Sequence, residues 1–140
     1  MTDYKMMMEF FNRRNTFDQT IGFEVTEMGD GWARGRIELK PELLNIINSL
    51  HGGVLCSLAD SISGVAAYSS GYYMTTMSMD LHFLNPAWKT KYVYAYAHAI
   101  KRGHNTWVLD SELTSDEGQL LVKATATYFN MGIPFPDEEA

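Results

Sequence analysis

The stretch HGGVLCSLADSISGVAAYSS, residues 51–70, decides the fold. Its large apolar side chains recur at helical spacing, which predicts one long helix over residues 53–70. The stripe consists of Val54, Leu55, Leu58, Ile62, Val65 and Ala66. Asp60 lies almost opposite this stripe, among small residues. We therefore expect a helix that buries its apolar side on a sheet and that lets another backbone approach its small side closely.

Strand-like runs separated by turn signals surround this helix. Four follow it, over residues 74–85, 91–102, 106–115 and 119–131, with hairpin turns at residues 103–105 and 116–118. Before it, Gly29-Asp30-Gly31 joins two strands predicted over residues 17–28 and 32–39, and residues 41–50 are irregular or form a short helical turn. One helix among consecutive antiparallel strands predicts an α+β domain in which a curved sheet wraps around the helix.

The two ends of the chain add little to this core. Apolar residues at helical spacing, from Tyr4 to Phe11, predict an extra N-terminal helix over residues 1–16. The segment from Ile133 carries two prolines and an acidic end, so residues 133–140 are predicted to fray. A length of 140 residues fits a single domain, 1–140.

Composition excludes several classes of function. Lys and Arg number 11 against 17 Asp and Glu, and the formal net charge of −6 argues against nucleic-acid and anionic-membrane binding. The sequence contains no apolar run of membrane-spanning length. A single cysteine and the lack of a signal-peptide pattern predict a cytoplasmic protein. The histidines and acids show no metal-ligand spacing, so no metal is expected.

Charge is nearly absent from the centre of the sequence. Between Leu43 and Trp88 there is no Lys, Arg or Glu, and the fixed charges are Asp60 and Asp80. A solvated helix and strand would carry more charges than this. The pattern indicates that the helix is covered on both sides, by its own sheet and by a second copy of the chain in a two-fold assembly. From the residues alone, an interface Asp60 and a solvated Asp60 are about equally consistent with the pattern.

Two further patterns could form a site. The strand predicted over residues 74–85 alternates, with Thr76, Ser78, Asp80 and His82 on one side, and such a polar side is either solvated or lines a site. His51-Gly52-Gly53 precedes the helix, where unpaired N–H groups and a partial positive charge can hold an oxyanion. A tight loop whose glycines only satisfy backbone geometry is the alternative explanation.

These residues together resemble a known family. Asn45, His51-Gly52-Gly53, Leu58-Ala59-Asp60 and the run from Ser78 to Pro86-Ala87 are similar to the hotdog-fold thioesterases of the PaaI-like and acyl-CoA thioesterase 13-like type, over about residues 22–128. The resemblance implies a hotdog fold and hydrolysis of acyl-CoA thioesters to a free acid and coenzyme A. It implies no cofactor, because coenzyme A is part of the substrate. It also implies a homodimer that pairs into a tetramer.

The resemblance assigns a role to each matching residue. Asp60 corresponds to the catalytic carboxylate, as general base or as nucleophile, and Ser78 to the hydroxyl that positions the attacking water. Gly52 corresponds to the backbone donor to the thioester carbonyl. Asn45 corresponds to an amide on the same carbonyl, and His51 to the histidine that orients that amide. In such enzymes the helix and the carbonyl-binding loop come from opposite subunits.

Substrate contacts are expected around this centre. Asn48 stands where many family members have glycine, so a second amide lies near the site, and Gly53 follows the carbonyl donor. Methionines on the predicted strand, Met77 among them, suggest an adaptable acyl pocket. Basic residues after Pro86-Ala87 could meet the coenzyme A end or could simply solvate hairpins; they are Lys89, Lys91, Lys101, Arg102 and His104.

Two other functions compete with hydrolysis. A hotdog dehydratase or hydratase needs a histidine and an acid beside the carbonyl, and the layout from His51 to Asp60 fits hydrolysis better. A non-catalytic acyl-CoA-binding or regulatory module is the second alternative. The presence of Asp60 and Ser78 together weighs against it.

Overall fold

A computed structural model describes residues 2–135 and confirms the α+β architecture. Two helices open the chain, α1 (Tyr4–Arg14) and α2 (Thr16–Ile21). Strands β1 (Phe23–Gly29) and β2 (Trp32–Glu38), a 3-10 turn η1 (Pro41–Leu43) and the long helix α3 (Gly52–Tyr68) follow. The remaining strands are β3 (Tyr72–Phe83), β4 (Tyr92–Arg102), β5 (Thr106–Ser115) and β6 (Leu120–Pro134).

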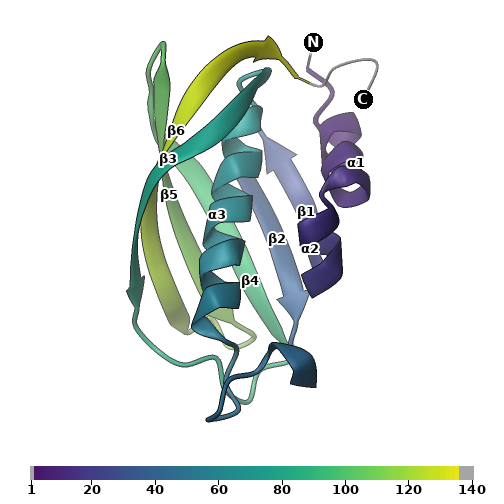
Figure 1. The fold of residues 1–140 in the computed structure, drawn as a ribbon, viewed down its shortest axis with the longest axis vertical. Helices are drawn as coiled ribbons and strands as arrows, with labels where there is room; N and C mark the ends of the chain where they lie inside the picture. Colours follow the sequence, from purple (N-terminus) through teal and green to yellow (C-terminus); the bar gives the residue numbers. More distant parts are fainter. Residues whose placement is uncertain (1, 136–140) are drawn as a thin grey trace.

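The six strands form one antiparallel sheet in the order β1-β2-β4-β5-β6-β3. The sheet curls around α3, and α1 and α2 lie beside β1 at one edge (Figure 1). β3 forms the opposite edge and pairs on one side with β6. This is the predicted curved sheet around a central helix, with the extra N-terminal helix also present.

Helix α3 is buried on more than its apolar stripe. Leu58 and Ile62 are fully buried, as expected, but so are Ser63 and Ala67 from the small side. A methyl group added at Gly64 would meet the ring of Tyr128 on β6 at 3.5 Å. Much of the small side is thus covered by the chain's own curled sheet. The prediction that the whole small side of α3 faces a second chain was therefore wrong, and the strip of α3 that another chain could reach is narrower than predicted.

The N-terminal segment differs from the prediction of one helix and then a strand from residue 17. Asn15 ends α1, and its side chain accepts the Asp18 N–H at 3.5 Å as the N-cap of α2. Gly22, at φ 84°, adopts the left-handed conformation that stops α2, so β1 begins at Phe23. Phe17, Ile21 and Phe23 mimic strand alternation, and the local caps override it.

The end of the described chain is also ordered further than predicted. β6 continues to Pro134, and Phe135 is 6% exposed. Phe135 packs in an aromatic cluster that joins α1, α3 and β3 and consists of Phe10, Phe11, Tyr68, Tyr73 and Phe135. The predicted fraying is therefore wrong for residues 133–135, and residues 136–140 lie outside the described residues.

A bulge changes the faces of β3. Thr76 pairs with Tyr128, but Ser78 pairs with Thr127, so β3 carries an extra residue at Met77. The predicted alternation placed Thr76 and Ser78 on the same face. The bulge instead places Thr76 on the inner face with Met79 and Leu81, which pack against the core, and leaves Ser78 on the outer face. Within residues 2–135, no helix is long and apolar enough to cross a membrane.

Candidate active site

Asp60 lies at the middle of α3 and faces the inner side of β3 and β6. Its Oδ1 accepts hydrogen bonds from Thr76 Oγ1 at 2.7 Å and from the Tyr128 hydroxyl at 2.6 Å. The same hydroxyl lies 2.5 Å from the Asp60 carbonyl oxygen. Within residues 2–135, no partner is found for Oδ2, so this oxygen can act on a ligand.

A cavity of about 220 Å³ opens beside this carboxylate. Asp60, Thr76 and Tyr128 line it, together with Met74 from β3 and Phe11 from α1. Met74 is buried and Phe11 is half-buried, so one wall is apolar. The arrangement places a carboxylate at the edge of a space with one apolar and one polar side.

The N-terminus of α3 carries the other part of the predicted site. His51 is the N-cap, and its Nδ1 accepts the Gly53 N–H at 2.8 Å, which places the proton of the neutral ring on Nε2. The N–H groups of Val54 and Leu55 donate to the His51 carbonyl. Among residues 2–135, the Gly52 N–H has no acceptor. Gly52 is therefore the donor that this helix end can offer to a ligand oxygen.

Asn45 closes the loop before this helix. Its Oδ1 accepts the N–H groups of Ile47 and Ser49, both at 3.1 Å, and its Nδ2 donates to Ser49 Oγ at 2.9 Å. One Nδ2 proton remains for a ligand. Asn48 is exposed at φ 59°, in the left-handed region that favours glycine and that asparagine also adopts. The orienting bond from His51 to Asn45 is not present within the described residues; His51 caps α3 instead.

The two groups of site residues lie apart within one chain. Asn45 and Gly52 line a separate cavity of about 290 Å³ with Phe83 and Pro86. Gly52 precedes Asp60 by eight residues, which corresponds to about 12 Å along an α-helix. An attacked carbonyl must lie about 3 Å from its donor and close to the attacking group. The chain therefore brings Asn45 together with Gly52, but neither of them together with Asp60.

Two predicted residues on β3 fall away from Asp60. Ser78 is exposed on the outer face opposite Thr127, and Met77, at the bulge, is 60% exposed. The hydroxyl that reaches Asp60 within the chain belongs to Thr76. Because both residues lie on the edge strand, a role for them at a subunit interface stays a prediction.

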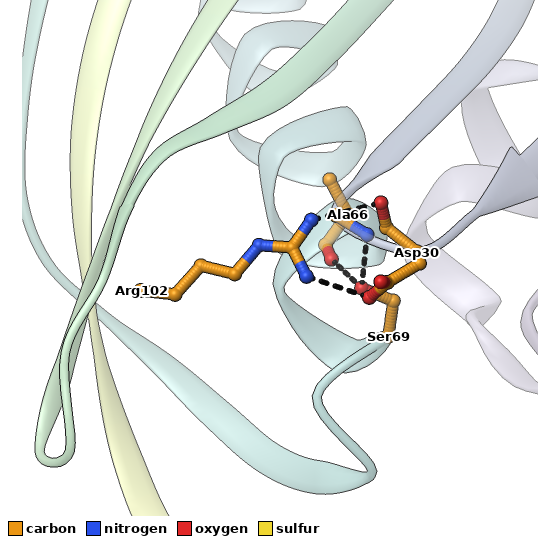
Figure 2. A network of polar contacts seen from close by, with 5 residues as sticks. Asp30, Ala66, Ser69 and Arg102 are labelled. Atoms are coloured by element: carbon orange, nitrogen blue, oxygen red, sulfur yellow. Dashed lines mark hydrogen bonds and ion pairs between the residues drawn. The ribbon is translucent and has the colours of Figure 1, made fainter.

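The predicted basic residues form no single cluster. Lys89 and Lys91 lie before β4, whereas Arg102 and His104 lie at its other end, about 30 Å away along an extended strand. Arg102 is already engaged: its guanidinium donates to Asp30 Oδ1 at 2.7 Å and to the Asp30 carbonyl at 2.9 Å (Figure 2).

The contacts of Arg102 belong to a structural network. Gly31 N–H donates to Ser69 Oγ at 2.8 Å, and Ser69 Oγ donates to the Ala66 carbonyl at 2.6 Å (Figure 2). The turn between β1 and β2 is thereby tied to the C-terminal end of α3. Arg102 thus holds this turn, which explains its position without a ligand.

A second carboxylate lies close to Asp60. Asp18 on α2 is 6% exposed, and it accepts Ser61 Oγ at 2.7 Å and Asn15 Nδ2 at 2.8 Å. Burial, and to a smaller extent the charge of Asp60, raise the pKa of Asp18, although its bond from Ser61 opposes this. Burial also raises the pKa of Tyr128 well above its usual range, and the Asp60 charge adds to the effect. Tyr128 therefore remains a hydrogen-bond donor over the whole working range of pH.

Comparison with known proteins identifies the family. Residues 47–122 match the sequence model of the thioesterase superfamily, which is more than half of the 140 residues. The chain therefore belongs to the thioesterase superfamily, and the predicted family is confirmed.

Individual relatives agree with this placement. The acyl-coenzyme A thioesterase PaaI of Escherichia coli is 28% identical over 71% of this chain and 71% of its own length. The solved structure of the E. coli PaaI protein superposes with a TM-score of 0.89 at 22% identity, over 94% of this chain and 95% of that chain, and shows that the hotdog fold is shared. A hypothetical thioesterase protein with coenzyme A from Streptococcus pneumoniae superposes with a TM-score of 0.79 at 27% identity, over 88% and 98% of the two chains.

The sequence did not indicate the two hydroxyls at Asp60. Thr76 was predicted on the polar face of β3 with Ser78, and the bulge that separates the two leaves no clear trace in the sequence. Tyr128 is one of 8 tyrosines, and its position opposite Thr76 follows from strand register, which the sequence specifies only through the whole sheet.

Proposed function

We propose that this protein hydrolyses acyl-CoA thioesters to a free acid and coenzyme A. The proposal rests on the carboxylate of Asp60 in a chain of the thioesterase superfamily. One oxygen of this carboxylate is held by two hydrogen bonds, and the other is available to a ligand. The name of the E. coli relative and the coenzyme A in the S. pneumoniae structure support the acyl-CoA class of substrate.

The chemistry follows from the groups at hand. Water attacks the thioester carbonyl carbon while Asp60 Oδ2 accepts its proton. The Gly52 N–H and the remaining Asn45 amide proton donate to the oxygen that becomes negatively charged. The C–S bond then breaks, and the proton held by Asp60 passes to the departing sulfur. The products are the free acid and the thiol of coenzyme A.

This mechanism requires a second copy of the chain. Gly52 and Asp60 of one chain lie about 12 Å apart along α3, too far to act on one carbonyl. Within residues 2–135, β3 is an edge strand of 12 residues whose backbone groups on one side pair with no other strand, and such a surface favours pairing with a strand of another chain. We infer a two-fold dimer in which each site takes Gly52 and Asn45 from one chain and Asp60 from its partner.

Thiol release is the decisive measurement. We expect the wild-type protein to liberate coenzyme A from members of an acyl-CoA panel, as detected with a thiol reagent. Asp60→Asn keeps the shape of the side chain and removes the base, so kcat should fall by roughly two to four orders of magnitude. Asp3→Asn is the matched control, because Asp3 is an exposed N-cap that asparagine can replace.

A non-catalytic binding module would give a different result. It would bind acyl-CoA in a binding measurement and release no thiol in the assay. Near wild-type turnover by Asp60→Asn would refute the carboxylate mechanism, even if the wild-type enzyme proves to be a thioesterase.

A further inference from the structure

The two hydroxyls at Asp60 converge on one of its oxygens. Thr76 and Tyr128 both approach Oδ1, at 2.7 and 2.6 Å, and the Tyr128 hydroxyl also contacts the Asp60 carbonyl at 2.5 Å. Two contacts to one residue, one on the side chain and one on the backbone, fix the position of the phenol relative to that turn of α3. The carboxylate is thereby limited in its rotation, with Oδ2 left for a ligand.

The strand register produces this convergence. Thr76 and Tyr128 are directly opposite each other in the β3–β6 ladder, and the bulge follows immediately after Thr76. A one-residue shift exchanges the two faces of a strand. Without the extra residue at Met77, the residues after Thr76 that now face outward would therefore face inward. The bulge therefore lets β3 present Thr76 to Asp60 and still pack Met79 and Leu81 in the core.

The environments of the two donors differ. Tyr128 is 2% exposed beneath α3, whereas Thr76 is exposed at the mouth of the cavity. A buried phenol keeps its proton beside the carboxylate, as the raised pKa of Tyr128 indicates. One donor is therefore permanent and shielded from water, and the other lies where a bound substrate would cover it.

We propose that Tyr128 and Thr76 are positioning residues that hold Oδ1 of Asp60 and so direct Oδ2 towards the water that attacks the thioester. The inference rests on the proposed function of Asp60. Neither residue touches the reacting atoms in this scheme; both act through the carboxylate. Their loss should therefore lower kcat while leaving the affinity for acyl-CoA nearly unchanged.

The test compares Tyr128→Phe and Thr76→Val with the wild-type protein. Each variant loses one hydrogen bond to a charged group, which should lower kcat roughly ten- to a hundredfold with little change in KM. Thr76→Ser restores the hydroxyl and should recover most of the rate.

Tyr73→Phe is the matched control, since Tyr73 is a half-buried tyrosine of β3 that packs against Tyr68 and Phe135. It should keep the wild-type kcat and KM. If Tyr128→Phe does not fold, Thr76→Val still tests the positioning role. Thr76 is exposed, so its substitution should disturb the fold little.

The outcomes separate this inference from the proposed function. If Asp60→Asn retains turnover, the carboxylate mechanism itself fails. If Asp60→Asn is inactive but Tyr128→Phe and Thr76→Val both show wild-type kcat and KM, the positioning role alone is overturned. A slower Tyr128→Phe together with an unaffected Thr76→Val would also overturn it and assign Tyr128 to packing.

Discussion

Gly52 is the first helical residue of α3, and this position allows its N–H to be removed without breaking the helix. Proline is favoured at the first helical position, where its missing N–H would have no helical partner. His51 before it is extended at ψ 136°, as a residue before proline must be. A side chain at Gly52 would meet Phe83 at 3.7 Å, an ordinary contact. The site therefore permits a substitution that keeps the helix, deletes the donor and places the proline Cδ where the amide hydrogen pointed.

We expect Gly52→Pro to lower kcat roughly a hundred- to a thousandfold, the usual effect of losing one oxyanion donor. KM should rise as well, because the proline Cδ occupies the place where the ligand oxygen would accept the N–H. Steady-state kinetics with one acyl-CoA would measure both parameters. Gly52→Ala retains the N–H and should keep most of the activity. Equal activity of the proline and alanine variants would remove Gly52 from the mechanism.

At the residue scale, the sequence was sufficient to identify groups whose role depends on residues next to them in the chain. His51, Gly52 and Gly53 are adjacent in the chain, and a helix end beside glycines has a defined chemistry wherever it occurs. Thr76 and Tyr128 act on Asp60 across 16 and 68 residues, and their approach depends on a bulge and on a ladder. The sequence could suggest Ser78 by resemblance, but it could not show which hydroxyl of β3 faces inward.

Helices and strands, too, were predicted well or poorly according to how far along the sequence their signals extend. The limits of α3, β4 and β5 agree with prediction to within one or two residues, because their periodicity is continuous and their turns contain strong signals. α2 was missed because six residues are too few to show a helical period. Its two ends are instead set by the Asn15 cap and by Gly22. A short helix defined by its caps looks like the start of a strand when apolar residues alternate through it.

Helix α2 is docked on α3 through a buried carboxylate, and this gives its stability a pH dependence. The pKa of Asp18 is raised in the folded state above its ordinary value of 3.8. A raised carboxyl pKa contributes stability that is fully present below that value and is lost as pH rises through the folded pKa. At neutral pH, the buried charge therefore destabilises the docking.

We expect Asp18→Asn to gain stability relative to the wild-type protein as pH rises from about 3.8 towards neutrality. The asparagine can still accept from Asn15 and donate to Ser61. Thermal unfolding at a series of pH values would measure the difference in Tm between the two proteins. Asp3→Asn, an exposed N-cap exchange, serves as the control for removing a surface carboxylate. A difference in Tm between Asp18→Asn and the wild-type protein that does not change with pH would contradict the assigned cause.

For the whole molecule, the charge-poor segment has two explanations that the sequence could not separate, one observed and one proposed. One is the chain's own sheet, which curls far enough to bury Ser63, Gly64 and Ala67. The other is the proposed partner, which would cover the edge strand β3 and bring a second Gly52 to Asp60. Burial inside one chain and burial between two chains leave the same composition. The two kinds of burial are distinguished only in the folded structure, where the sheet closes around α3.

A shared site makes a quantitative prediction about mixed dimers. A Gly52→Pro chain and an Asp60→Asn chain should each form homodimers with both sites impaired. In a mixed dimer, one site collects both substitutions and the other collects neither. Random reassociation makes about half of the dimers mixed, with half of their sites intact. About a quarter of the wild-type activity should therefore return after joint refolding.

The two variants would be mixed in mild denaturant, refolded together and assayed against each variant refolded alone, with subunit exchange verified by differently tagged chains. Recovery of activity requires that Gly52 and Asp60 act across a subunit boundary, because neither variant chain contains both. If each chain held a complete site, every site in the mixture would lack one group and activity would stay at the level of the parents. The separation of about 12 Å along α3 would then have to be closed by a rearrangement within the chain, and not by a partner.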